Sequence, residues 1–243
     1  MEHKNTWLLY DEEQTKKAYD FAEEYKDFLN RGKTERECID EIVYQIEKAG
    51  FEELEAAIAE KKTLKAGDKV YHVQMNKSVV MFTIGKQPME TGMNILGAHL
   101  DSPRLDVKQN PLYEDGGLAY LDTHYYGGVK KYHWVTMPLA IHGVAVKKDG
   151  TTIELNVGED EDEPVFFISD LLIHLAAEQM EKKGAKVVEG EALDIIVGNR
   201  PIVIEPETAE EKKEAEPGKA AKDAVKKGVL AILKEKYDIE LND

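Results

Sequence analysis

The stretch Met93-Asn-Ile-Leu-Gly-Ala-His-Leu-Asp-Ser-Pro-Arg-Leu-Asp106 decides the expected fold of this chain. Its first residues are apolar or small, which predicts a short strand, and Pro103 prevents that strand from continuing regularly. His99 and Asp101 therefore emerge at the end of the expected strand. Because the two residues are two positions apart, their side chains project to the same side of an extended backbone.

This His-x-Asp pair has two interpretations. In the first, the carboxylate of Asp101 accepts a hydrogen bond from one imidazole nitrogen of His99, and the other nitrogen binds a metal. In the second, the histidine is hydrogen-bonded to a turn aspartate and only stabilises a loop. The spacing alone leaves both interpretations open.

The residues before this stretch predict helices followed by paired strands. Apolar residues recur at helical spacing over residues 12–29. Thr34 and Glu37 form a capping pair that begins a second helix, which ends at Gly50. A short helix is expected at residues 52–61, and alternating β-branched residues predict strands at 69–74 and 79–84.

The residues after the stretch predict a β-rich region. The expected strands are residues 118–122, 131–136, 139–147, 151–157, 193–197 and 202–204. A helix is expected to begin at Ser169 or Asp170 and to end at Gly184. Residues 205–219 contain almost nothing apolar and are expected to form a mobile loop, after which residues 220–237 return to helical periodicity.

Composition excludes several classes of function. The chain has 243 residues, 42% hydrophobic and 33% charged, which is typical of a globular protein with one large or two unequal domains. Its net charge of −16 disfavours nucleic acid and anionic lipid as partners. No apolar run approaches the roughly 20 residues that cross a bilayer. A single cysteine, Cys38, and no leader-like start favour a cytoplasmic location, with Cys38 as a small core residue.

Several segments together resemble the aspartyl aminopeptidase, or aminopeptidase I, family of dinuclear zinc exopeptidases. They are Gly97-Ala-His-Leu-Asp-Ser-Pro-Arg-Leu-Asp106, Lys108-Gln-Asn-Pro-Leu112, Asp122-Thr-His-Tyr-Tyr-Gly-Gly128, Trp134, Asp170-Leu-Leu-Ile-His-Leu175 and Gly198-Asn-Arg-Pro201. The resemblance implies an α/β zinc-exopeptidase-like catalytic domain interrupted by a β-rich dimerisation domain. Residues 1–106 would be the N-terminal part of the catalytic domain, and residues 107–243 the dimerisation domain, lacking its last strand.

The same resemblance implies a site and a reaction. His99 would be a ligand of one of two zinc ions, and Asp101 the catalytic-site carboxylate that orients it; cobalt or manganese could replace zinc. His174 would reach the active site of a partner subunit, although a histidine hydrogen-bonded at a subunit interface is the alternative. The reaction is removal of N-terminal residues from peptides with a free N-terminus, by a homo-oligomer that is a dimer or a dodecamer.

The sequence departs from the family pattern in one respect. By the same resemblance, the site also contains a bridging aspartate, a Glu-Glu pair, a further aspartate and a second histidine, and no segment here matches the bridging-aspartate motif. We therefore expect an incomplete chain, the N-terminal portion of a metalloaminopeptidase, which is inactive without the missing C-terminal portion. The alternative is a catalytically silent dimerisation or assembly module. His124 is expected to pack with aromatic neighbours.

Overall fold

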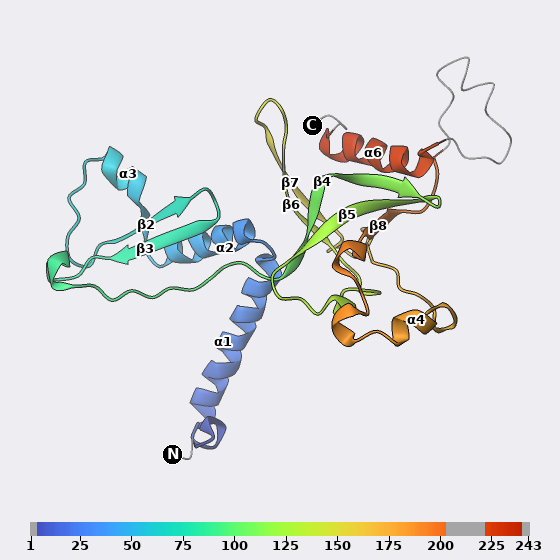
Figure 1. Ribbon diagram of the computed structural model, residues 1–243. Helices are drawn as coiled ribbons and strands as arrows, with labels where there is room; N and C mark the ends of the chain where they lie inside the picture. The colour runs from blue at the N-terminus through green and yellow to red at the C-terminus, as the bar shows by residue number, and fades with distance from the viewer. Residues whose placement is uncertain (1–3, 203–221, 240–243) are drawn as a thin grey trace. The chain divides into compact units, whose positions relative to one another are not determined.

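The structure is a computed structural model that describes residues 4–202 and 222–239 (Figure 1). The chain divides into two units, Met1–Ser102 and Pro103–Asp243. Each unit has its own helices, and the first contains one sheet and the second two. The assignment of the two parts to a catalytic and a dimerisation domain stays a prediction.

Two capped helices begin the first unit. The side chain of Asp11 accepts a hydrogen bond from the backbone of Gln14 and begins α1 (Glu12–Arg31), and Thr34 begins α2 (Glu35–Lys48) in a capping box with Glu37. Such boxes satisfy backbone N–H groups that a helix leaves without partners at its start. The predicted start of the second helix is thus confirmed. Neither α1, with 20 residues, nor any other described helix is long and apolar enough to cross a membrane.

Polar contacts hold α2 in place within the first unit. Glu41 on α2 is buried, and its carboxylate lies 3.1 Å from the guanidinium of Arg31 on α1. The hydroxyl of Tyr71 donates to Glu47 of α2 at 2.7 Å, and burial, followed by this hydrogen bond, raises the pKa of Tyr71 to about 12. Cys38 is buried, as expected, and burial raises the pKa of its thiol. The thiol therefore stays protonated at neutral pH.

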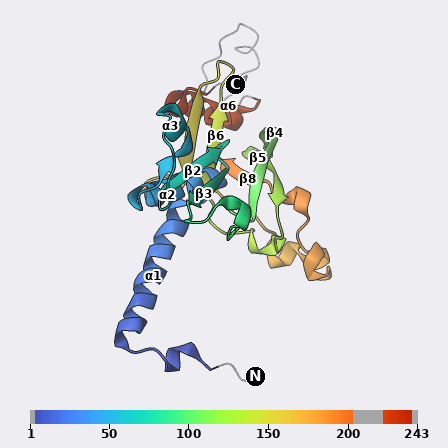
Figure 2. The same ribbon diagram turned by 90° about the vertical axis from the view of Figure 1, so that its left-hand side faces the viewer.

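The sheet of the first unit has three strands in sequence order. β1 (Glu52–Glu53) pairs in parallel with β2 (Lys69–Gln74), which pairs antiparallel with β3 (Ser78–Thr83). Figure 2 shows α2 and α3 (Leu54–Ala59) next to this sheet. Both predicted strands are confirmed, whereas the helix expected at residues 52–61 is shorter, because its first two residues pair with β2.

The second unit contains two antiparallel sheets. β4 (Arg104–Asp115) and β5 (Leu118–Tyr126) form a long hairpin, to which β8 (Ile195–Gly198) adds on the side of β5. β6 (Ile141–Val146) and β7 (Thr152–Val157) form the other sheet. The core consists of Phe166, Ile168, Val188, Leu193 and Ile195. This core joins residues of β8 to the segments that precede it.

A carboxylate from β4 caps the helix that ends the described chain. α6 (Ala224–Tyr237) lies beside β4, β5 and β8 (Figure 1). Its own N-cap residue, Asp223, makes no capping hydrogen bond with its side chain. Instead, Glu114 accepts hydrogen bonds from the backbone N–H groups of Val225 and Lys226, both at 2.9 Å. The negative charge also favours the helix N-terminus, where the helix dipole is positive.

Two expected elements of the second unit are wrong. Residues 131–136 form a 3-10 turn (Lys131–His133) rather than a strand, and Thr136 has a φ of 60°, which an extended strand cannot hold. The helix expected from Ser169 or Asp170 is reduced to a 3-10 turn (Ile173–Leu175) and α4 (Ala177–Met180). Only Ala176 is buried between residues 171 and 180, so the apolar pattern has nothing to pack against.

Three further expectations fall wholly or partly on residues outside the described ranges. The mobile loop predicted at residues 205–219 lies entirely outside them, as do the last two residues of the strand predicted at 202–204. The predicted C-terminal helix is confirmed as α6 over residues 224–237.

Replacing Glu114 with alanine should destabilise the second unit. The change removes the acceptor for two N–H groups at the start of α6, so we expect the free energy of unfolding to fall by about 1–2 kcal/mol, as for the loss of a strong helix cap. Urea unfolding followed by circular dichroism measures the effect. Asp115→Ala, at the next and exposed position of β4, is the matched control. Equal stability of the two variants would contradict the cap.

Candidate metal ligand and a polar network

His99 and Asp101 lie together in a segment without regular secondary structure. The Nδ1 atom of His99 lies 3.3 Å from the carboxylate oxygen Oδ1 of Asp101 and 3.0 Å from the backbone oxygen of the same residue. The side chain of His99 is 84% exposed, and that of Asp101 43%. Because Nδ1 is engaged, Nε2 on the far side of the imidazole ring is the nitrogen that can bind a metal.

The strand expected before His99 is not formed. Residues 93–98 have no strand assignment, and they make no backbone hydrogen bond with another described residue. Ile95 is 80% exposed and Leu96 99%. An extended segment becomes a strand only when a neighbour supplies backbone donors and acceptors, and within the described residues none does. The predicted strand before His99 is therefore wrong, whereas the predicted proximity of the His99 and Asp101 side chains is confirmed.

The residues present fit one ligand position of a zinc site. A histidine whose second nitrogen is held by a carboxylate is the usual arrangement around zinc. Zinc takes about four ligands, however, and within residues 4–202 and 222–239 no group of three or more His, Cys, Asp or Glu is placed to hold a metal. The His99–Asp101 pair thus has the chemistry of one ligand and its supporting carboxylate, and a complete site would need further donors.

His174 lies in the second unit, whereas His99 lies in the first. It is part of the 3-10 turn Ile173–Leu175, and its side chain is exposed. Leu172, directly before the turn, and Leu175, its last residue, are both exposed. Its predicted role at the active site of a partner subunit stays a prediction.

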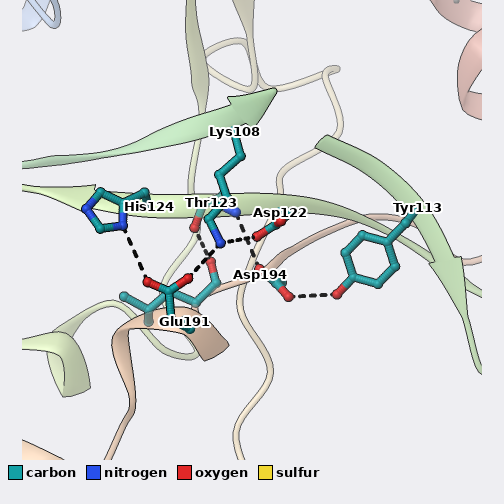
Figure 3. A network of polar contacts seen from close by, with 8 residues as sticks. Lys108, Tyr113, Asp122, Thr123, His124, Glu191 and Asp194 are labelled. Atoms are coloured by element: carbon teal, nitrogen blue, oxygen red, sulfur yellow. Dashed lines mark hydrogen bonds and ion pairs between the residues drawn. The ribbon is translucent and has the colours of Figure 1, made fainter. Parts of the chain in front are cut away.

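A polar network in the second unit was not predicted from the sequence (Figure 3). The ammonium group of Lys108 on β4 lies 2.8 Å from Asp122 on β5 and 2.7 Å from Glu191. His124 also faces Glu191, with its Nδ1 at 3.5 Å from the carboxylate, and its ring stacks on Tyr125. Glu191 belongs to a 3-10 turn (Gly190–Ala192) that is far from Lys108 in the sequence.

The same network continues through Asp194 (Figure 3). Its carboxylate accepts a hydrogen bond from the hydroxyl of Tyr113 at 2.7 Å. Thr123 is fully buried and donates from its hydroxyl to the backbone oxygen of Leu193 at 2.5 Å. Burial, followed by the hydrogen bond to Asp194, raises the pKa of Tyr113. These contacts fasten the segment before β8 to the β4–β5 hairpin.

The pKa values of Lys108 and Glu191 are shifted by contacts within the network. The two carboxylates raise the pKa of Lys108, and Lys108, as the main cause, lowers the pKa of Glu191. Both shifts favour the charged pair. We call the Lys108–Glu191 ion pair the clamp. Its role is structural, because the charged groups of Lys108 and Glu191 each face an opposite charge within the network.

Comparison with known proteins shows which family this chain resembles. Residues 28–243 match the family model described as aminopeptidase I zinc metalloprotease (M18). A probable M18 family aminopeptidase 1 from Clostridium acetobutylicum is 52% identical over 242 residues, which are 100% of this chain and 49% of the relative.

Solved structures agree with the sequence comparison. An M18-family aminopeptidase from Thermotoga maritima is similar with a TM-score of 0.84 and 39% identity, covering 100% of this chain and 48% of that one. Aminopeptidase I from Clostridium acetobutylicum has a TM-score of 0.79 and 51% identity, covering 100% and 50%. The chain therefore spans about half the length of the relatives it matches.

The pH dependence of stability should report on the Lys108–Glu191 pair. Because the pKa of Glu191 is lowered in the folded state, its contribution is present above the unfolded value of about 4 and is lost as pH falls through the lower folded value. Lys108→Met removes the main cause of the shift. We expect the melting temperature of this variant to fall less steeply than that of the wild type below about pH 4. Identical slopes would contradict the clamp.

Proposed function

Because this chain belongs to the M18 family of aminopeptidase I zinc metalloproteases, we propose that it forms part of an enzyme that removes N-terminal residues from peptides. The observation that carries the proposal is the His99–Asp101 pair, in which the carboxylate faces Nδ1 at 3.3 Å. It supports His99 as a zinc ligand through Nε2. The pair lies within the part of the chain that matches the family model.

Each residue of the pair has a separate task in the proposed reaction. Asp101 holds the imidazole of His99 in one orientation and keeps the proton on Nδ1, so that Nε2 presents a lone pair. His99 then holds a zinc ion at the exposed end of its side chain. When bound, a pair of zinc ions polarises the scissile carbonyl and makes hydroxide available near neutral pH. His174 is proposed to help position the substrate of a partner subunit.

The isolated chain is proposed to be inactive. A zinc ion takes about four ligands, and the pair supplies one of them with its support. The part of the chain described by the structure offers no larger group of metal-binding side chains. This finding also favours the second candidate, an assembly module without activity of its own, as the state of this chain when it is alone.

Oligomerisation and location belong to the same proposal. We propose that the complete enzyme is a homo-oligomer, and that the exposed apolar residues around His174 contribute to its contacts, because exposed apolar side chains in succession are typical of interfaces. Leu171, Leu172, Ile173 and Leu175 are the residues concerned. A cytoplasmic location is supported by one cysteine that is buried and free.

The metal content of the purified chain separates the two candidates. If the chain alone lacks a complete site, it should retain well under one zinc ion per molecule after dialysis and should not cleave an aminoacyl anilide. Elemental analysis and a colorimetric assay measure both. About two tightly held zinc ions together with turnover would contradict the proposed inactivity.

Substitutions at the pair should impair the complete enzyme. In this chain completed with the half of the Clostridium acetobutylicum relative that it does not cover, Asp101→Asn should reduce zinc affinity about 10–100-fold, and His99→Ala should reduce it more, because a ligand is lost rather than its support. Isothermal titration with zinc and kcat/KM measure the effects. His133→Ala, in the turn Lys131–His133, is the control. Unchanged affinity in His99→Ala would remove His99 from the site.

A further inference from the structure

An exposed segment of the second unit leaves the core and returns to it. Residues 169–186, which we call the arm, extend away from β4, β5 and β8 around α4 (Figure 1). All of them are exposed except Ala176, which is buried, and Gln179, which is half-buried. Within the described chain, their backbone hydrogen bonds join residues at most four positions apart. The position of the arm therefore depends on the residues at its two ends.

The two ends of the arm meet in one core. Ile168, directly before the arm, is 2% exposed and belongs to the same core as Val188. Residues 187–192 follow the arm, and we call them the root. Gly190 of the root lies so close to Tyr125 on β5 that a Cβ atom there would clash with the ring. The root thus fastens the arm to the β4–β5 hairpin.

Glu191 of the root contacts the hairpin through both oxygens of its carboxylate (Figure 3). Oε2 lies 2.7 Å from the ammonium group of Lys108 in the clamp, and Oε1 lies 3.5 Å from Nδ1 of His124. The first contact joins two groups that are charged at neutral pH. The second is an ion pair only when the imidazole is protonated, because the neutral ring carries no charge.

Further charged groups lie around His124. Its register partner on β4 is Asp106, whose carboxylate accepts a hydrogen bond from Nε of Arg104 at 2.7 Å. The ring of His124 stacks on Tyr125, and the ammonium group of Lys131 lies 5.2 Å from the centroid of that tyrosine ring. The carboxylate that faces Nδ1 across to the root is therefore the one whose contact with the arm changes when the imidazole gains a proton.

The carboxylate of Glu191 keeps its charge at neutral pH. Lys108, as the largest cause, lowers the pKa of Glu191, and His124 contributes in the same direction. Asp122 and Glu191 in turn raise the pKa of Lys108, which stays charged as well. An imidazole changes charge between about pH 5 and 8. In that range the network gains or loses one charge, the one on His124.

We propose that the root is a proton-sensitive fastening for the arm: a proton on His124 adds an ion pair with Glu191 that holds the root on β5, and loss of this proton at higher pH loosens the root and lets the arm move. The contact is exposed, so its effect is graded rather than all-or-none. The inference goes beyond the proposed function, because it concerns the mobility of the arm whatever His174 on it binds.

Hydrogen exchange of the full chain measures this fastening. The amides of Ala192 and Leu193 report on the root, since they donate to the backbone oxygens of Glu189 and Gly190 within it. Protection factors are compared at about pH 6 and about pH 8, because they remove the intrinsic pH dependence of amide exchange. We expect both amides to be about 2–5-fold more protected at the lower pH, which is the range of an exposed ion pair.

Variants assign the effect to His124. In His124→Gln the ring that gains a proton is absent, so the protection of the two amides should be equal at both pH values. Glu191→Gln should lower their protection at both, because it also breaks the clamp. His133→Gln, at an exposed position of the turn Lys131–His133, is the matched control and should keep the wild-type difference.

A salt titration and a second set of amides complete the test. In about 1 M sodium chloride, where charges are screened beyond about 3 Å, the difference between the two pH values should shrink in the wild type. The amides of α6 should show equal protection at both pH values. Equal protection of Ala192 and Leu193 in the wild type, or a difference that persists in His124→Gln, overturns the proposal. A difference of the same size in α6 also overturns it, because it would reflect the stability of the whole unit.

Discussion

A β-strand cannot satisfy its own backbone, and this constraint governs how the two units of the chain differ. Every strand named in the structure has a hydrogen-bonded neighbour. Residues 93–98 have the composition of a strand but no such neighbour among the described residues, and they stay irregular. The proposed zinc ligand, His99, directly follows this segment, so the described structure holds it on irregular backbone.

In the second unit, by contrast, contacts within the unit hold its segments together. Its long hairpin, β4 with β5, is joined to later parts of the chain by charged groups: Lys108 holds Glu191, and Glu114 holds the start of α6. Buried Thr123 adds a hydroxyl contact to the segment before β8. These interactions hold the later segments of the unit against the hairpin. The second unit thus has its own internal supports, whereas the described residues before His99 have no paired backbone.

Local signals in the sequence were sufficient for elements that depend on local contacts. The Thr34–Glu37 capping box and the alternating residues of β2 involve neighbours a few positions apart, and both were predicted. The pairing of Glu114 with Val225 could not be, because 111 residues separate them and only the fold brings them together. The helix expected after Asp170 failed for a related reason, since its apolar side chains have no surface to cover. The adjacency of His99 and Asp101 was predictable, whereas the absence of a strand before them was not.

The most direct test of the central claim is nuclear magnetic resonance of the assembled enzyme, with nitrogen-labelled histidine and a spin-active cadmium isotope in place of zinc. If Asp101 holds Nδ1 and the metal binds on the other side of the ring, a scalar coupling to cadmium should appear at Nε2 of His99 while Nδ1 keeps its proton. A coupling at Nδ1, or none at His99, would contradict the account.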